Sequence, residues 1–229
     1  MEQKQLQNLQ QHFNFNSHDR KYAPDEIFYA GDLNLLLNGA RVSVVGSRKP
    51  SENGIKRTRA LVKSLVKQGI TVVSGMAEGV DTIAHNTALK SGGKTIAVLG
   101  SPLDNPYPKS NTLLFNELVK NHLVISQFQN GNQIKKGNFP IRNRTMALIS
   151  DATIIVEASE TSGTRHQGWE AIRLGRTLYL LENVANNKSL SWPAQMIEHG
   201  AKILQNINLE ERLNSIPRNI IGMHENVAL

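Results

Sequence analysis

The sequence lacks cysteine, long hydrophobic runs and all but a few aromatic residues, and each absence narrows what the protein can be. Without cysteine among its 229 residues, the chain forms neither disulfides nor thiolate metal sites. Its longest apolar runs reach about six residues, whereas a membrane-spanning helix needs about 20. The first residues, MEQKQLQNLQQHFNFN, lack the apolar segment of a secretory signal. These absences favour a cytoplasmic protein without a membrane segment.

Acidic residues are also in short supply, and the basic excess is clustered. The chain has 26 Lys and Arg against 19 Asp and Glu, a net charge of +7. Between Arg41 and Lys67 eight cations face only one acid, Glu52, and the stretch from Lys135 to Arg144 holds four cations and no acid. Clustered positive charge favours an anionic partner such as nucleic acid.

From residue 42 onwards, short apolar segments alternate with segments of helical spacing. We expect strands at 42–45, 70–74, 95–99, 123–126, 152–157, 178–181 and 202–204. We expect helices at 55–68, 81–90, 111–120, 142–149, 167–174 and 191–199, with Asp81 as the cap of the second. This alternation predicts an α/β fold, a mostly parallel sheet with helices on both faces.

The chain is expected to divide into three parts. Residues 1–40 form a polar leader and a connecting segment, with a short extended piece at 27–30. Residues 41–205 form the core. Residues 206–229 form a polar tail that we expect to be partly loose.

Small residues follow several of the expected strands, at the edge where parallel sheets bind ligands. Gly46, Ser47, Arg48 and Lys49 follow the first strand. The second is followed by Ser74 and Gly75, and the fifth by the run Ser162-Gly163-Thr164. Glycine lets backbone N–H groups approach a ligand, and helix N-termini favour anions, so this edge is predicted to bind phosphate. Taken singly, each glycine is better explained by a tight strand-to-helix turn, and only the loops taken together with Arg48 favour ligand binding.

The familiar nucleotide-binding motifs are missing. No G-x-x-x-x-G-K-[ST] occurs, which argues against a Walker-type hydrolase, and no G-x-G-x-x-G follows the first strand, which argues against an ordinary dinucleotide dehydrogenase. The seven histidines show no metal-ligand spacing.

Two further groups of cations leave alternatives open. A stripe on the outer face of helix 55–68 is either a solvated face or a track for a nucleic-acid backbone; it consists of Lys56, Arg59, Lys63 and Lys67. The segment 135–144 mixes cations, Phe139 and a glycine, the ingredients of a single-strand groove. Arg142 and Arg144 cannot share one helix face, so we expect different roles, one of them as a buried partner of Glu157 or Asp151.

Three other residues have a structural explanation that we prefer. Asp81 and His85 are one helical turn apart, but a helix-cap hydrogen bond explains Asp81 better than acid–base chemistry does. Trp169 could stack on a base, yet core packing is the simpler interpretation.

Several motifs occur in one order along residues 27–204: VGSRKP…NG, SGMAEGVDTIAH, TIAVLGSPLDNPYP, FPIRNR, VEA…SG and a closing GR. This ordered set resembles the DNA-processing protein A (DprA/Smf) family. The resemblance implies an extended Rossmann-like fold and a cytoplasmic homodimer. It also implies a protein without enzymatic activity or cofactor. Such a protein protects incoming single-stranded DNA and loads a RecA-class recombinase during natural transformation or recombination.

The resemblance places DNA-contacting positions on Arg48, on Lys136 and on the Ser162-Gly163 turn. Together with the residues selected from the pattern, the predicted nucleic-acid interface comprises Gly46, Ser47, Arg48, Lys49, Ser74, Gly75, Lys135, Lys136, Arg142, Arg144, Ser162, Gly163, Thr164 and Arg165.

The sequence also departs from the family pattern. Glu78 stands where the family often has a basic residue, and it should repel phosphate. An apolar and small-residue run usually follows the Ser-Gly turn, but here the chain reads Thr-Arg-His-Gln-Gly-Trp, in which Arg165 could replace the missing charge. We also expect neither the winged-helix domain nor the N-terminal helical domain that often accompanies the family.

Two alternatives from other classes stay open. One is a nucleotide phosphoribohydrolase of the lysine-decarboxylase-like type, which uses a glutamate just after a Gly-Thr turn. Here those positions are His166 and Gln167, and Glu170 lies one helical turn further on. The other is a nucleotide-sensing module without catalysis.

Overall fold

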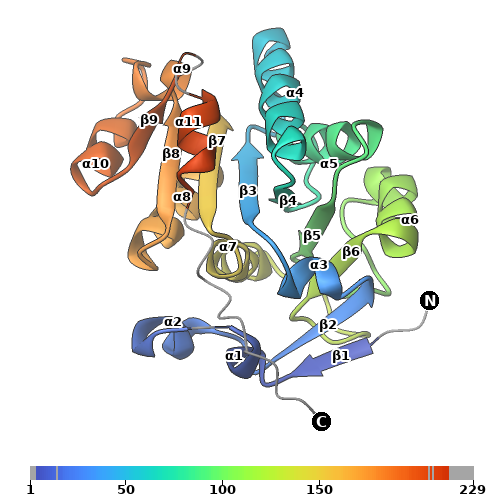
Figure 1. Ribbon diagram of the computed structural model, residues 1–229. Coiled ribbons are helices and arrows are strands. Elements are labelled where there is room, and N and C mark those ends of the chain that lie inside the picture. The colour runs from blue at the N-terminus through green and yellow to red at the C-terminus, as the bar shows by residue number, and fades with distance from the viewer. Residues whose placement is uncertain (1–3, 14, 206, 208, 217–229) are drawn as a thin grey trace.

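One continuous sheet organises the chain. The structure is a computed structural model that describes residues 4–13, 15–205, 207 and 209–216 (Figure 1). Within these residues the sheet has nine strands in the order β1-β2-β6-β5-β4-β3-β7-β8-β9. The pairs β1–β2 and β2–β6 are antiparallel and every other pair is parallel. The predicted α/β class with a mostly parallel sheet is therefore confirmed.

The strands and helices alternate along the chain as the sequence predicts. The strands are β1 (Lys4–Gln7), β2 (Glu26–Gly31), β3 (Arg41–Gly46), β4 (Thr71–Ser74), β5 (Thr95–Leu99), β6 (Leu123–Ser126), β7 (Ala152–Glu157), β8 (Thr177–Leu181) and β9 (Lys202–Leu204). The helices are α1 (Leu9–His12), α2 (Ser17–Tyr22), α3 (Asn34–Leu37), α4 (Glu52–Lys67), α5 (Val80–Lys90), η1 (Lys109–Asn111), α6 (Thr112–Asn121), α7 (Asn138–Leu148), α8 (Thr164–Arg173), α9 (Glu182–Ala185), α10 (Trp192–Glu198) and α11 (Leu209–Asn214).

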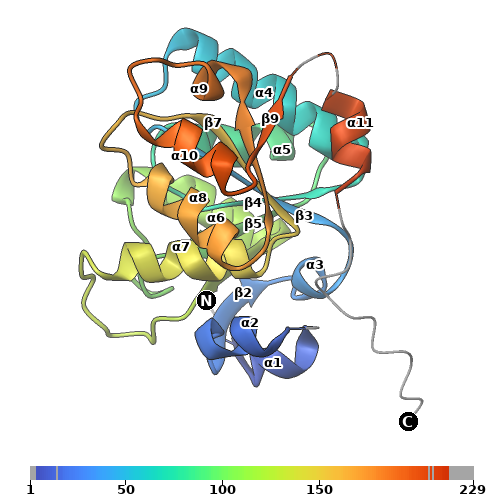
Figure 2. The same cartoon turned by 90° about the vertical axis from the view of Figure 1, so that its left-hand side faces the viewer.

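Both faces of the sheet are apolar because both are covered. Along β3, Val42 and Val44 pack under α4 and α5, whereas Val45 packs with the opposite cluster under α7, α8 and α10. Figure 2 shows α7, α8 and α10 on the near side of the sheet and α4 and α5 behind it. Strands buried on both faces read as continuous apolar runs, which explains why the periodicity located them.

The start of α5 differs from the prediction. Asp81 does not cap the helix: the cap is Gly79, at φ 80°, and Asp81 lies within the first turn. A side chain at Gly79 would collide with the backbone of Ser47 and Arg48, so the chain needs glycine to enter the helix there. The Asp81 carboxylate accepts a hydrogen bond from the Ala77 N–H instead (3.2 Å).

The described part of residues 1–40 packs against the sheet. The expected extended piece is strand β2, which pairs with β6, and β1 adds a further strand beside it. Leu9, Phe13 and Phe15 are buried in the same cluster as α7 and α8. The sequence did not predict β1, α1 or α2, because short polar segments carry little periodicity. The division at residues 40 and 205 remains a prediction.

At the other end, α11 lies against α4. Leu213 is buried with Leu61 and Leu65, and Lys67 forms an ion pair with Glu210 (3.0 Å). Residues 206, 208 and 217–229 of the predicted tail lie outside the described residues. None of the helices in the described ranges has the length and apolar character needed to cross a membrane.

Candidate nucleic-acid interface

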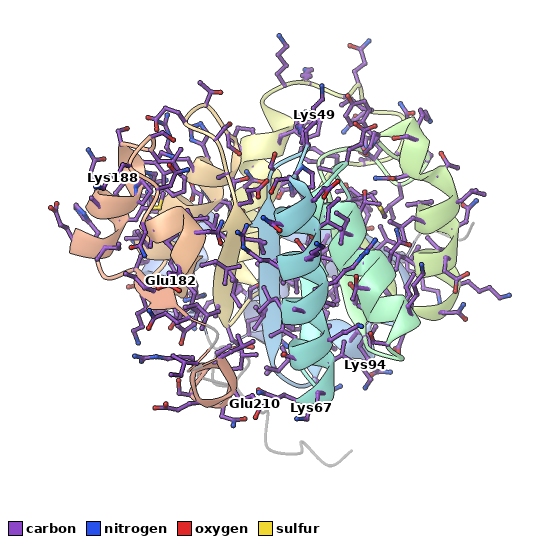
Figure 3. All side chains as sticks on the ribbon, turned by 90° about the horizontal axis from the view of Figure 1, so that it is seen from above. Lys49, Lys67, Lys94, Glu182, Lys188 and Glu210 are labelled. Carbon is purple, nitrogen blue, oxygen red and sulfur yellow. The ribbon has the colours of Figure 1, made fainter. Side chains whose placement is uncertain are left out.

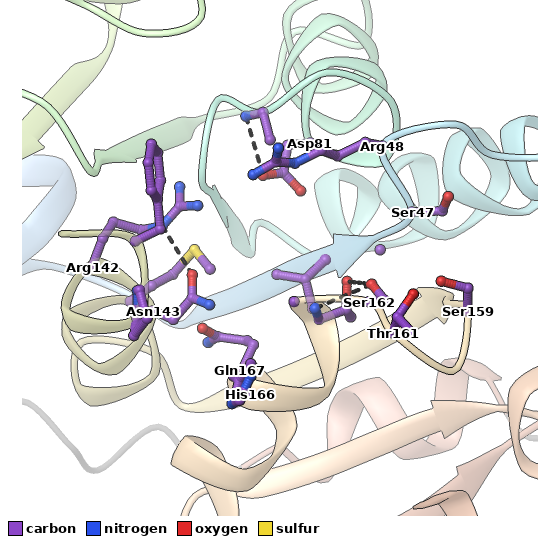
Figure 4. A pocket seen from close by; sticks show the side chains of 18 of the residues that line it. Ser47, Arg48, Asp81, Arg142, Asn143, Ser159, Thr161, Ser162, His166 and Gln167 are labelled. Atoms are coloured by element: carbon purple, nitrogen blue, oxygen red, sulfur yellow. Dashed lines mark hydrogen bonds between the residues drawn. The ribbon is translucent and has the colours of Figure 1, made fainter. Parts of the chain in front are cut away.

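A cleft of about 540 Å³ lies at the carboxyl ends of β3 and β7, between α7 and α8 (Figure 4). It brings together residues from four parts of the chain: the loop after β3, Ala77 and Asp81 around the start of α5, the first half of α7, and the segment from Ser159 into the start of α8. The predicted site residues that line it are Gly46, Ser47, Arg48, Lys49, Arg142, Ser162, Gly163 and Thr164. The edge of the sheet that the sequence selected thus carries a cleft.

The loop after β3 is held by its backbone and leaves its cations exposed. The Ser47 N–H donates to the Glu157 carbonyl (2.7 Å), and the Val80 N–H donates to the Ser47 carbonyl (3.1 Å). Arg48 and Lys49 are exposed, and neither takes part in an ion pair with any described residue. A fixed loop with two unpaired cations is suited to binding an anion.

The turn before α8 is the opposite wall of the cleft. Ser162 Oγ accepts a hydrogen bond from the Thr164 N–H (3.2 Å) and donates one to Thr164 Oγ1 (2.9 Å). These bonds fix a short turn that presents small polar side chains to the cleft, with Gly163 exposed between them.

The N-terminus of α4 is occupied by a carboxylate of the protein, that of Glu157. The Glu157 carboxylate accepts hydrogen bonds from the Ser51 N–H (2.7 Å) and the Ser51 hydroxyl (2.6 Å), and Arg57 lies 3.7 Å away. The N-cap residue of α4 is therefore engaged by a carboxylate of the protein, and the predicted binding of phosphate at this edge stays a prediction. Glu157 compensates the helix dipole in place of a ligand.

Arg142 is buried although it lines the cleft. Only 6% of it is exposed, and Nη1 donates to the carbonyl oxygens of Gly75 and Val98, the latter at 3.0 Å. Burial lowers the pKa of Arg142, and the negative charge of Asp81 opposes that shift. Burial likewise raises the pKa of Asp81, and the Arg142 charge opposes it. The two groups stabilise each other's charged forms beneath the cleft.

Arg144 faces away from the cleft. Its Nε donates to Glu170 Oε2 (2.9 Å), and its guanidinium carbon lies 4.8 Å from the centre of the Tyr22 ring. The two arginines of α7 therefore have different roles, as predicted, and one of them is buried. The predicted partners are wrong, because Asp151 pairs with Arg41 (3.6 Å) and Glu157 with Arg57.

Besides Arg144, five further predicted residues do not line the cleft. Ser74 is buried and donates to the Val44 carbonyl (2.7 Å), while Gly75 lines a smaller cavity beside it. Lys135 and Lys136 are exposed in the loop before α7, and Arg165 is half-buried on α8. Their contact with a nucleic acid remains a prediction.

Glu78 and Arg48 both line a smaller cavity, and of the two only Arg48 also lines the cleft. The two residues share the smaller cavity with Gly75, and Glu78 Oε1 accepts a hydrogen bond from the Ser110 hydroxyl (2.8 Å). Arg165 lines neither cavity. That Arg165 replaces the positive charge missing at position 78 stays a prediction.

Among the other residues singled out from the sequence, His85 is buried and its Nδ1 lies 2.8 Å from Thr95 Oγ1. Burial lowers the pKa of His85 to about 3.

Trp169 packs against the core and meets the His199 ring edge-on, as expected for a packing residue. On α4 the basic stripe is exposed, and Figure 3 shows Lys67 beside Glu210 at the opposite end of the helix from Lys49.

The predicted interface left out several cleft residues, although Phe139 was noted within the basic segment 135–144. Phe139, Asn143 and Met146 of α7 and His166 and Gln167 of α8 line the cleft. Their spacing on α7, 139, 143 and 146, follows one helix face and could have revealed them. The positions on α8 lie in the segment where the sequence departs from the family pattern.

Three kinds of comparison place the chain among known proteins. The family model of DNA recombination-mediator protein A matches residues 6–214. The chain is 38% identical to the DNA processing protein DprA of Streptococcus pneumoniae, over 80% of this chain and 64% of that protein. It is 35% identical to the protein Smf of a Synechocystis strain, over 85% of this chain and 50% of that protein. The chain thus spans about half to two thirds of the length of these relatives.

Solved structures agree with the sequence comparisons. The X-ray structure of DprA from S. pneumoniae superposes with a TM-score of 0.76 at 34% identity, covering 88% of this chain and 70% of that one. The DprA structure from Helicobacter pylori, described for its single-stranded DNA binding mode, superposes with a TM-score of 0.77 at 28% identity. This match covers 93% of this chain and 95% of that one. A molybdenum cofactor binding protein from Rippkaea orientalis, at 19% identity and a TM-score of 0.56, shares the fold alone. The chain belongs to the DNA recombination-mediator protein A family.

Proposed function

We propose that this chain binds single-stranded DNA in the cleft between α7 and α8, mainly through phosphate groups. The observation that carries the proposal is the pair of exposed, unpaired cations on the loop after β3, directly opposite the Ser162–Thr164 turn. The H. pylori relative, whose structure is described for its single-stranded DNA binding, supports this choice of ligand. Because phosphate contacts carry no sequence information, binding has little sequence preference.

The biological role that we propose is recombination mediation. The chain protects incoming single strands and delivers them to a recombinase of the RecA class, in natural transformation or in recombination more generally. Membership of the family supports this role. We also propose that the chain acts in the cytoplasm as a homodimer, for which light scattering at micromolar concentration gives twice the mass of one chain.

We propose further that the chain is not a nucleotide hydrolase. The candidate catalytic carboxylate, Glu170, does not line the cleft, and its two oxygens are held by Arg144 (2.9 Å) and Arg173 (2.7 Å). A carboxylate with both oxygens engaged by guanidinium groups is not free to contact a substrate or to position a water molecule. Release of free base from nucleoside monophosphates at turnover rates, abolished by Glu170→Gln, would overturn this part of the proposal.

A competition experiment tests the binding proposal. A labelled oligothymidine is bound by the protein and challenged with unlabelled oligothymidine, duplex of equal length and thymidine monophosphate, at several salt concentrations. We expect the single strand to compete best and the mononucleotide to compete weakly. Equal competition by duplex, or binding that does not change with salt, would contradict the proposal.

A further inference from the structure

One residue of β7, Glu157, holds both ends of the loop that carries Arg48. At the first end, its carbonyl oxygen accepts the hydrogen bond from the Ser47 N–H (2.7 Å). At the other end, its carboxylate accepts hydrogen bonds from the N–H and the hydroxyl of Ser51, at 2.7 and 2.6 Å. Arg48 lies between these two anchors. The loop 47–51 is therefore fixed at both ends by one residue that is distant from it in the sequence.

Two glycines leave room for these contacts. The register between β3 and β7 shifts after Val45, so that Gly46 pairs with Glu157. A Cβ on Gly46 would lie 2.9 Å from the Glu157 carbonyl oxygen, and a Cβ on Gly54 would lie 2.5 Å from the carboxylate Oε2. Both distances are shorter than the contacts that real Cβ atoms make. The chain thus keeps space for the backbone and the side chain of Glu157, which a solvated surface glutamate would not need.

The Glu157 carboxylate has no direct part in binding an anion. It does not line the cleft, its side chain is only 20% exposed, and it is paired with Arg57 at 3.7 Å. A negative charge near a phosphate site repels the ligand. What its contacts do instead is restrict the backbone on both sides of Arg48. A binding loop that is already ordered loses less conformational entropy when the ligand binds.

We propose that Glu157 is a positioning residue for the binding of single-stranded DNA and acts through Arg48, whose place at the cleft it fixes. The inference rests on the proposed binding of single-stranded DNA and adds the residue that orders the binding loop. It also predicts a distinctive sign. Removing this negative charge weakens the binding of a polyanion, whereas charge repulsion alone predicts stronger binding.

The test measures the affinity of the full chain for a labelled oligothymidine at one fixed salt concentration. Glu157→Ala removes the anchor at Ser51 and should weaken binding about fivefold, within the range of coupling between contacting residues. Glu157→Gln removes the same charge but keeps an acceptor for the Ser51 N–H, so it should recover part of the loss. Glu211→Ala, at an exposed position on α11, is the matched control for the loss of one acid and should bind at least as well as the wild type.

A double-mutant cycle separates positioning from a general effect on the fold. If Glu157 acts through Arg48, Glu157→Ala should cause no further loss of affinity in a protein that already carries Arg48→Ala. A further loss of the same size in that background would place the effect elsewhere and overturn the proposal. If Glu157→Ala alone binds as well as Glu211→Ala, single-strand binding stands and the positioning role is wrong. If the wild type does not bind oligothymidine, the proposed function falls together with this inference.

Gly54→Ala replaces Glu157→Ala in these comparisons if the latter does not fold. It keeps the carboxylate but displaces it, because the new Cβ takes the place of Oε2. Alanine also favours a helix more than glycine does, and Gly54 lies within α4. We expect a folded Gly54→Ala protein to bind oligothymidine more weakly than the wild type. Wild-type affinity in that protein would overturn the proposal.

Discussion

The loop after β3 and the helix α7 both present closely spaced cations, but their side chains lie in different surroundings. Arg48 and Lys49 extend from a loop that is fixed by backbone hydrogen bonds, and both side chains are exposed. On α7, Arg142 is buried against two carbonyl oxygens and Arg144 is paired with Glu170. The cations on the packed helix form hydrogen bonds and ion pairs within the protein, whereas those on the loop fixed by its backbone remain available to a ligand.

The largest expected effect comes from the buried member of this comparison. Arg142→Leu removes the guanidinium, leaves the Asp81 carboxylate buried without its opposite charge and frees the carbonyl oxygens of Gly75 and Val98. We expect a loss of about 3–5 kcal/mol in the free energy of unfolding, the range for breaking a buried charge pair. Urea denaturation followed by circular dichroism measures it. A loss below 1 kcal/mol would show that Arg142, like Arg48 and Lys49, contributes little to the stability of the fold.

The next largest effect is on binding. Arg48→Ala should weaken the binding of oligothymidine by about 1–3 kcal/mol, the scale of a hydrogen bond to a charged group, and should leave the unfolding free energy unchanged. Arg48→Lys should recover only part of the affinity, since lysine lacks the planar fork of donors. Fluorescence anisotropy gives the affinity and thermal melting checks the fold. An unfolded Arg48→Ala protein would make this arginine a structural turn residue.

Arg144 should have a smaller effect, and on stability. A third of its side chain is exposed, so solvent screens its interaction with Glu170. We expect Arg144→Ala to lower the unfolding free energy by about 1 kcal/mol or less. Oligothymidine affinity should stay unchanged, because the side chain does not line the cleft. A clear loss of affinity in a stable Arg144→Ala protein would place this residue in the interface after all.

Lys49 should have the smallest effect. It lines the cleft like Arg48, but its ammonium is a hydrated point charge without the planar fork of donors of an arginine, so Lys49→Ala is expected to cost only about a few tenths of a kcal/mol in binding. Lys94→Ala, at an exposed position before β5, is the matched control for the loss of one positive charge. If Lys49→Ala weakens binding as much as Arg48→Ala does, the two neighbouring cations share the phosphate contact.

The same contrast explains how much the sequence could predict. The strands were predictable because residues such as Val42 and Val44 are buried on both faces of a parallel sheet, where apolar runs are obligatory. The loop cations were predictable because a position two residues after a strand lies at the ligand edge. The role of Arg142 and the occupancy of the α4 N-terminus by Glu157 were not, because they depend on which distant segments meet. A polar residue such as Gln167 reveals nothing in the sequence about whether its amide is buried.

The measurement that tests the account most directly is the salt dependence of oligothymidine binding by the wild type and Arg48→Ala. If the cleft binds phosphates through Arg48, the logarithm of the wild-type affinity falls linearly with the logarithm of salt concentration. The slope for Arg48→Ala should then be shallower by about 0.7, the value for one phosphate contact on a single strand. Identical slopes for the two proteins, or a wild-type affinity that does not respond to salt, would contradict the account.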